Sequence, residues 1–434
     1  MGRLTGFIAR TLTTAAVLIT AVGALPSARS ADLAVDGRTN AYPSIAAHGR
    51  FVAVTWGATT KDGTTDIFVA TSVDGGRTFK RPAQVTDVTS QANLSGEQPP
   101  RVALVAHTDG VPSVVVTWTS KGQRGTRLLS ARSDDGGQSF SRPGVLPGSE
   151  APGNRGWQSI ATDSDGRVVT VWLDHRELAP PAGSAASPAH SGHLHGASAT
   201  QQRDSVARAQ LSKLLFVREG RGAQTKALSG GVCYCCKTAI ATGPDRSVYT
   251  AWRHVYPGNV RDIAFTMSRD GGRTFAPPTR VSEDNWVLDG CPENGPSIAI
   301  EGHGRIHVIW PTLVPGSTSD SEPTLALFYA MSEDGRRFTP RLRIPADGFP
   351  RHVEMILDAR GRVVAAWEEQ VGGTRRVVLG RGSPEAGAMK FAREVISDAL
   401  PAVYPVVAAA ADGIVAAWTS GPAGQTVVRT AQLP

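Results

Sequence analysis

The stretch Ser72-Val-Asp-Gly-Gly-Arg-Thr-Phe79 decides the fold, because closely related stretches return three times along the chain. The other copies are Ser133-Asp-Asp-Gly-Gly-Gln-Ser-Phe140, Ser268-Arg-Asp-Gly-Gly-Arg-Thr-Phe275 and the shorter Ser332-Glu-Asp-Gly-Arg-Arg-Phe338. Asp and Ser side chains bond to nearby backbone amides, and glycine accepts the positive φ of a tight turn. A turn that recurs in this way predicts a repeat architecture.

A second repeat consists of a short apolar strand followed by a second strand that ends in tryptophan. Its seven tryptophans are Trp56, Trp118, Trp172, Trp252, Trp310, Trp367 and Trp418. Most units carry Asp-Gly or a near equivalent between the two strands, which is a strong hairpin signal. Neighbouring tryptophans are 51 to 80 positions apart, by subtraction, and this leaves room for about four strands in each unit. The pattern predicts an all-β, seven-bladed β-propeller, and a six-bladed ring with one unit miscounted is the alternative.

The two ends of the chain predict how the ring closes. The last unit, 404–434, has room for only three strands. Residues 31–36 have the character of the missing outer strand, and pairing there would leave no exposed sheet edge. We therefore expect one propeller domain over 31–434, with a low-complexity insertion at about 178–210 that contains His190, His193 and His195.

The N-terminus has the features of a secretory signal peptide. Arg3 and Arg10 precede an apolar run at 15–25, and the small residues Ala28 and Ser30 suit a cleavage site. The run is too short for a membrane span. We expect residues 1–30 to be removed and the protein to be secreted or periplasmic.

The charge of the chain excludes two classes of partner. The formal net charge is +7, and removing Arg3, Arg10 and Arg29 with the leader leaves +4. The sequence has no cluster of Lys and Arg and no basic helix. It therefore predicts neither a nucleic acid nor an anionic membrane as partner.

The octets resemble Asp-boxes, and the chain resembles the sialidase-like, Asp-box (BNR-repeat) β-propeller superfamily. The resemblance implies that the four octets are structural and lie on the face opposite the ligand site. It also implies a possible activity, because sialidases of this superfamily use three arginines, a Tyr activated by a Glu, and an Asp. The Arg-Ile-Pro hallmark is missing ahead of the first octet, where Asn40-Ala-Tyr-Pro-Ser-Ile45 stands instead, and Arg343-Ile-Pro345 follows the fourth octet. A glycoside hydrolase of the exo-sialidase type, acting on acidic glycans, is therefore the alternative function, and whether the protein is an enzyme stays open.

Propeller topology places the loops before the first strand of each blade, and those after each tryptophan, on one working face. The face collects candidates for a sialidase site whose roles the spacing does not assign. They are Arg176, Arg253 and Arg351 for a clamp, Tyr404 or Tyr42 for a nucleophile, and Glu354, Glu368 or Asp174 for its partner.

All four cysteines lie on the same predicted face, before the first strands of blades four and five. Cys235 and Cys236 are adjacent, so their Cα atoms are about 3.8 Å apart, which is too close for an ordinary disulfide. Cys291 can bridge only one of Cys233, Cys235 and Cys236, so two thiols remain. The residues predicted to hold a soft metal, Cu(I) or Zn(II), are Cys233, Cys235, Cys236, Cys291, His175 and His254. A structural disulfide cluster and a nucleophilic cysteine are the alternatives.

The predicted function is an exported propeller that binds a ligand or handles a soft metal through this cluster. Its partner would be a glycan or a metal donor. The residues predicted to bind the ligand are Arg176, Arg253, Arg261 and Tyr404. These arginines have an ordinary alternative role, which is to pair with local carboxylates such as Asp262. A protein-interaction scaffold is a third hypothesis, which the fold alone permits.

Overall fold

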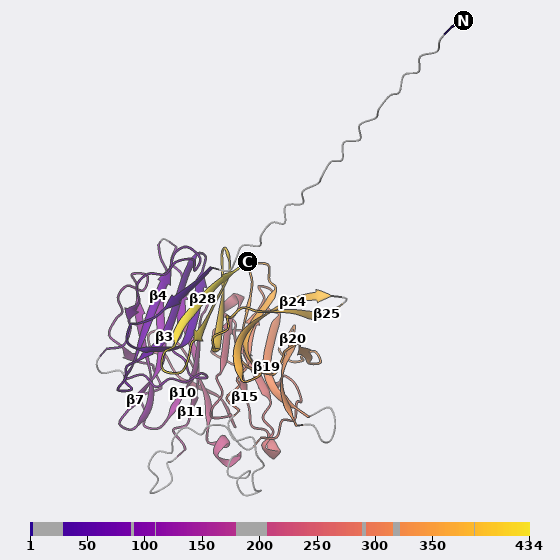
Figure 1. The fold of residues 1–434 in the computed structure, drawn as a ribbon. Helices are drawn as coiled ribbons and strands as arrows, with labels where there is room; N and C mark the ends of the chain where they lie inside the picture. The colour runs from indigo at the N-terminus through magenta and orange to yellow at the C-terminus, as the bar shows by residue number, and fades with distance from the viewer. Residues whose placement is uncertain are drawn as a thin grey trace.

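The computed structural model describes residues 1–2, 29–87, 91–108, 110–178, 206–288, 292–315, 322–385 and 387–434. Their strands form seven antiparallel sheets of four strands each, arranged as the blades of a β-propeller (Figure 1). The seven-bladed prediction is confirmed, and the six-bladed alternative is excluded.

The first three blades alternate strand and turn as the hairpin signals predict. Blade one comprises β2 (Thr39–His48), β3 (Phe51–Thr59), β4 (Thr65–Ser72) and β5 (Ala83–Gln84). Blade two comprises β6 (Arg101–Val105), β7 (Ser113–Gly122), β8 (Gly125–Ser133) and β9 (Gly144–Val145). Blade three comprises β10 (Arg155–Thr162), β11 (Val168–Asp174), β12 (Lys213–Arg218) and β13 (Lys226–Gly230).

Blades four to six continue the pattern, and two 3-10 turns, Pro244–Arg246 and Pro257–Asn259, lie in blade four. Blade four comprises β14 (Ala239–Thr242), β15 (Val248–Arg253), β16 (Ile263–Ser268) and β17 (Thr279–Arg280). Blade five comprises β18 (Ser297–Ile300), β19 (Ile306–Val314), β20 (Thr324–Ser332) and β21 (Leu342–Ile344). Blade six comprises β22 (Phe349–Leu357), β23 (Val363–Val371), β24 (Thr374–Glu385) and β25 (Ala388–Val395).

Blade seven is built from both ends of the chain. It comprises β26 (Ala402–Ala410), β27 (Gly413–Ser420), β28 (Val427–Leu433) and β1 (Arg29–Leu33). The strand β1 pairs antiparallel with β28, from Arg29 opposite Gln432 to Leu33 opposite Val428. Figure 1 accordingly shows the yellow β28 beside the indigo strands of blade one, and β2 contacts both β26 and β28. The expected closure of the ring is confirmed, with the closing strand at Arg29–Leu33 instead of 31–36, and it leaves β28 with a partner on each side.

The first strand of each blade faces the centre of the ring. These inner strands contact one another in sequence order, from β2 through β6, β10, β14, β18 and β22 to β26, and β26 contacts β2. The seven tryptophans lie within the second strands, one to four residues before the strand ends, and they are at most 1% exposed. Each core cluster joins neighbouring blades, as when Trp56 of blade one packs with Val406 and Ala417 of blade seven. The hydrophobic core is therefore a ring of contacts between blades.

The octets form the expected turns between the third and fourth strands of their blades. In the third octet the Ser268 hydroxyl donates to Asp270 at 2.7 Å and accepts from the Gly272 amide at 2.9 Å. Asp270 also accepts from the Thr274 amide at 2.9 Å and the Thr274 hydroxyl at 2.7 Å. The Thr274 hydroxyl and then its amide lower the pKa of Asp270. The octet aspartates thus serve the turns.

Helices long and apolar enough to cross a bilayer are lacking among the described residues.

Candidate functional site

Four of the inner strands carry the same irregularity at their start. The register of β2, β10, β22 and β26 shifts by a β-bulge, between Ala41 and Ser44 in the first of them. One residue of each bulge has a left-handed backbone, and these residues are Tyr42 (φ 61°), Trp157 (φ 53°), His352 (φ 50°) and Tyr404 (φ 55°). Such a conformation is strained for large side chains and is concentrated at functional sites.

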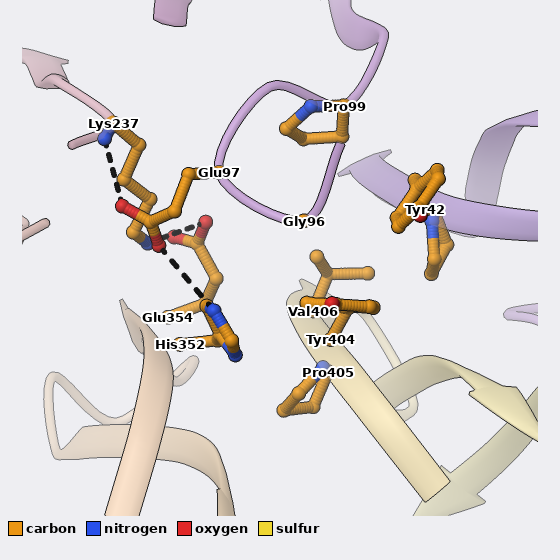
Figure 2. A pocket seen from close by; sticks show the side chains of 11 residues that line it. Tyr42, Gly96, Glu97, Pro99, Lys237, His352, Glu354, Tyr404, Pro405 and Val406 are labelled. Atoms are coloured by element: carbon orange, nitrogen blue, oxygen red, sulfur yellow. Dashed lines mark hydrogen bonds and ion pairs between the residues drawn. The ribbon is translucent and has the colours of Figure 1, made fainter. Parts of the chain in front are cut away.

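Three of these bulge residues lie together at the mouth of the central channel. We call the pocket that they line the mouth pocket, and its side chains come from five blades (Figure 2). The lining residues are Tyr42, Pro43, Gly96, Glu97, Pro99, Lys237, His352, Glu354, Tyr404, Pro405 and Val406. The Tyr404 ring lies 5.2 Å from Tyr42 and 4.7 Å from His352, centroid to centroid. Gly96 has no room for a side chain, because an added Cβ would lie 1.9 Å from the Tyr404 ring.

Glu97 ties the loops around the mouth pocket together. One of its carboxylate oxygens, Oε2, accepts from the amides of Lys237 and Gly295, each at 2.8 Å. The other, Oε1, lies 4.0 Å from His352 Nε2. Figure 2 draws this ion pair as a dashed line. This oxygen is buried and has no hydrogen-bond partner among the described residues. A buried acceptor left unpaired is costly, so Oε1 is a point at which a hydrogen-bond donor of a ligand would be stabilised.

A histidine and a glutamate form an ion pair beneath Tyr404. His352 Nδ1 lies 3.1 Å from Glu368 Oε1, and Glu368 Oε2 accepts from the backbone amide of Tyr404 at 2.8 Å. Burial opposes the charged form of His352, but the Glu368 carboxylate outweighs it and raises the histidine's pKa. Burial and then Glu368 raise the pKa of Tyr404 to about 12. The pocket therefore holds a protonatable imidazole beside a neutral phenol.

A second charge cluster lies beside His352 in the same pocket. Glu354 Oε1 lies 2.7 Å from Lys237 Nζ and 3.2 Å from Arg101 Nη1. Burial would raise the pKa of Glu354, but the two cations, Lys237 first, lower it. The opposite charges of Glu354 and Lys237 therefore balance each other in the pocket.

The cysteines of the loop 231–238, which we call the Cys loop, form a compact group directly before Lys237. Cys233, Cys235 and Cys236 are at most 5% exposed, and their sulfurs all lie within 4.8 Å of one another. Cys233 Sγ lies 3.8 Å from Cys235 Sγ and 3.9 Å from Cys236 Sγ. Cys233 and Cys236 are free thiols, whereas Cys235 is disulfide-bonded. Cys291 lies outside the described residues.

The electrostatics of the Cys loop differ from one sulfur to the next. Arg261 Nη1 donates to Cys233 Sγ at 3.0 Å. The hydrogen bond with Cys236 is the largest cause that lowers the pKa of Cys233. Burial opposes it, but the charges of Arg261 and Arg253 add to it, and the pKa falls to about 6. Burial and then Cys233 raise the pKa of Cys236. Cys233 is thus the sulfur that carries the thiolate.

The two histidines predicted as metal ligands are not part of the group that the sulfurs form. His254 Nδ1 accepts from the indole of Trp252 at 3.4 Å. The same acceptor position, two residues after the tryptophan, is filled by Asp174 beneath Trp172 and by Glu369 beneath Trp367. His175 Nδ1 bonds to the Ser212 hydroxyl at 3.1 Å, and its buried Nε2 has no partner among the described residues. Metal ligation by either histidine stays a prediction.

The predicted ligand-binding residues lie in different surroundings. Arg176 pairs with Asp174 at 2.7 Å through both Nε and Nη2. Arg253 donates to the carbonyls of Asn294, Arg261 and Pro311. Arg261 contacts Cys233, and Tyr404 alone of the four lines the mouth pocket. The histidines of the insertion, His190, His193 and His195, lie outside the described residues.

Glu97 was missed by sequence reasoning. It stands in the loop before the first strand of blade two, which is the same loop position as the Cys loop in blade four. That position was a usable signal, but the pairing of Glu97 with Lys237 and Gly295 spans 140 and 198 residues of sequence. A lone acidic residue in a loop gives no indication of such partners.

Comparison with known proteins supports the fold but shows no family and no activity. No protein-family model matches the chain, and no curated protein matches its sequence. Among solved structures, a polysaccharide lyase described as an ulvan lyase is similar with a TM-score of 0.55 and 9% identity, over 93% of this chain and 94% of that one. An α-L-arabinofuranosidase from Fusarium graminearum is similar with a TM-score of 0.50 and 12% identity, over 93% and 95%. A Hadza microbial sialidase has a TM-score of 0.46 and 11% identity, over 86% and 73%. The predicted resemblance thus holds at the level of a β-propeller fold shared with glycosidases and polysaccharide lyases.

Proposed function

We propose that the protein is an extracytoplasmic β-propeller that binds a carbohydrate at the rim of the mouth pocket, whose interior of about 10 Å³ has room for little more than one water molecule. The observation that carries the proposal is the convergence of Tyr42, Tyr404, His352 and Glu97 from different blades on one pocket. Two aromatic faces beside hydrogen-bonding groups suit a sugar, which has apolar C–H faces and a rim of hydroxyls. An ulvan lyase of the same fold, with a TM-score of 0.54, has been solved bound to a glycan that contains glucuronic acid.

The charges of the pocket favour a sugar recognised by hydroxyls over one recognised by a carboxylate clamp. Lys237 is compensated by Glu354, and His352 is paired with Glu368. Two of the arginines considered for a sialidase clamp, Arg176 and Arg253, already donate to Asp174 and to backbone carbonyls. The exo-sialidase hypothesis therefore receives less support than glycan binding.

The test is a binding screen of the purified full chain against neutral and acidic oligosaccharides. We expect micromolar to millimolar binding that Tyr404→Ala weakens at least about ten-fold, which corresponds to roughly 1.4 kcal/mol. Phe349→Ala is the matched control, because Phe349 is an exposed aromatic that does not line the pocket. Equal losses in the two variants, or no binding by the wild type, would refute the proposal. Release of reducing ends or of unsaturated sugars in the same screen would show that the pocket also cleaves its ligand.

A second function, soft-metal handling by the Cys loop, is favoured by the separation of its sulfurs. Tetrahedral Zn(II) thiolates with bonds of about 2.3 Å place their sulfurs roughly 3.8 Å apart, and trigonal Cu(I) thiolates are similar. The separations from Cys233, 3.8 and 3.9 Å, match this value. Binding by all three sulfurs requires Cys235 in the reduced form, because a disulfide sulfur is not a thiolate ligand.

Metal content measured after anaerobic reduction and reconstitution tests the second function. We expect one Cu(I) or Zn(II) per chain, lost in Cys233→Ser and retained in Cys291→Ser if the three clustered sulfurs suffice. An absence of bound metal in the reduced wild type would rule the function out.

A further inference from the structure

The Cys loop contains a dithiol whose two members have different surroundings. Cys233 and Cys236, both free, are three positions apart, and their sulfurs are separated by 3.9 Å. This is the Cys-x-x-Cys spacing of dithiols that interconvert with disulfides. Closing the gap to a bond of about 2.05 Å requires rotation of the side chains within one short loop.

The two sulfurs are suited to different roles. Cys233 Sγ accepts from the guanidinium of Arg261 at 3.0 Å, and this contact stabilises negative charge on the sulfur. The Arg261 side chain is itself fixed by Nε, which donates to the Leu288 carbonyl at 2.7 Å. Cys236, which contacts Cys233, is placed to supply the second thiol. Cys233 is therefore the nucleophile and Cys236 the resolving residue.

We propose that Cys233 and Cys236 are a peroxide-reactive pair, in which Cys233 attacks a water-sized hydroperoxide and Cys236 closes an internal disulfide. In the first step the Cys233 thiolate forms a bond to one peroxide oxygen, the O–O bond breaks, and the other oxygen leaves as hydroxide, which takes up a proton. Cys233 is then a sulfenic acid. In the second step Cys236 attacks the Cys233 sulfur, the S–O bond breaks, and water leaves. Two thiols and one hydrogen peroxide thus give one disulfide and two waters.

The burial of the pair sets the size of the oxidant. Cys233 is 1% exposed and Cys236 is 2% exposed. Neither a protein disulfide nor a bulky organic hydroperoxide can reach a sulfur enclosed to this degree without unfolding the loop. Hydrogen peroxide is close to water in size and needs only a small local opening. The oxidant class is therefore a small inorganic hydroperoxide.

The reaction is independent of both proposed functions. It uses the metal-free protein, and a metal on the same sulfurs would compete with it for their lone pairs. It does not involve the aromatic wall of the mouth pocket. Glycan binding can therefore fail while the oxidation holds, and the oxidation can fail while metal binding holds.

The experiment treats the full-length, metal-free chain with hydrogen peroxide and follows free thiols and tryptic peptides by mass spectrometry. We expect the wild type to lose both thiols and to gain a Cys233–Cys236 linkage. Cys236→Ser should stop at a sulfenic acid on Cys233 that dimedone traps, and Cys233→Ser should leave Cys236 unmodified. Arg261→Met should slow the oxidation about ten-fold, and Arg261→Lys should restore part of the rate.

Oxidant size and folding provide the controls. Cumene hydroperoxide and oxidised glutathione should react with the folded wild type far more slowly than hydrogen peroxide does. After denaturation, the three oxidants should react at equal rates. Circular dichroism should show that each variant has the wild-type sheet content. The proposal is overturned if Cys233 reacts with hydrogen peroxide no faster than free cysteine, if dimedone labels Cys236 first, or if the bulky oxidants react as fast as the small one.

Discussion

At the scale of single residues, burial and charge shift the pKa values of the histidines of this protein in opposite directions. Burial lowers the pKa of His175 to about 4, and it does the same to His254. The Glu368 carboxylate instead raises the pKa of His352, although burial opposes it. The pH dependence of stability should therefore have separate acidic and basic components.

His175 should make the protein less stable in mild acid. The unfolded chain binds a proton at this residue near pH 6.5, whereas the folded chain binds it only near pH 4, so the free energy of unfolding falls as pH falls through this window. His175→Gln should flatten the slope by about 1.4 kcal/mol per pH unit at most. Urea unfolding at several pH values measures it. His48→Gln, at an exposed position, should leave the slope unchanged, and equal slopes in all three proteins would contradict the prediction.

His352 should affect the free energy of unfolding between neutral and alkaline pH. Its folded pKa is raised, so its stabilising pairing with Glu368 is fully present below about pH 6.5 and is lost as pH rises through the higher folded value. His352→Asn should remove this decline in unfolding free energy between neutral and alkaline pH. Glu368→Gln should remove it as well. A decline that persists in both variants would show that another group causes it.

At the scale of elements, the octet turn depends on two glycines that are needed for different reasons. Gly271 and Gly272 have φ values of 75° and 83°, which L side chains rarely adopt. A Cβ at Gly271 would meet nothing closer than 3.7 Å, whereas one at Gly272 would lie 2.3 Å from the Phe216 ring of blade three. The second glycine therefore joins the turn to the neighbouring blade.

The two glycines allow backbone strain and steric overlap to be separated. Gly271→Ala should destabilise the protein by about 1 kcal/mol, the usual cost of a left-handed alanine. Gly272→Ala should cost a further 1–3 kcal/mol or so, because Phe216 must move within a packed core. Chemical unfolding midpoints compare the two variants. Equal losses would mean that the contact with Phe216 does not constrain the turn.

The left-handed residues of the inner strands are a second feature at the scale of elements. The bulges that bring Tyr42, His352 and Tyr404 to the mouth pocket lie in β2, β22 and β26. The sequence placed Tyr42 and Tyr404 on the working face, but it did not indicate their left-handed backbone. Strain of this kind is not readable from residue types, because a left-handed backbone is uncommon for any residue other than glycine.

At the scale of the whole molecule, stability depends on the latch between the ends of the chain. Asp32 of β1 makes a two-point ion pair with Arg429 of β28, at 2.7 and 2.9 Å. Without β1, the outer edge of β28 would be open to solvent and to other chains. Closure of the ring by the N-terminal strand is thus a property of the assembled fold.

Two truncations test the latch. A chain that begins at Ala31 keeps the pairs from Ala31 to Leu33, so it should melt close to the full chain. A chain that begins at Asp36 loses all of β1 and should melt several degrees lower and aggregate on heating. Scanning calorimetry with light scattering measures both effects. If the two truncated chains behave alike, the latch does not stabilise the ring.

The sequence by itself determined the number of blades, the octet turns and the closure, because each rests on local chemistry: Asp and Gly in turns, tryptophans at strand ends, and a missing strand. It also identified the three clustered cysteines, since they are close in sequence. Only the tertiary structure showed the partners of Glu97 and His254. The first gains its partners from loops far along the chain, and the second fills a place beneath Trp252 that Asp174 and Glu369 fill elsewhere. Such pairings depend on which side chains the ring brings together, and residue type alone does not encode that.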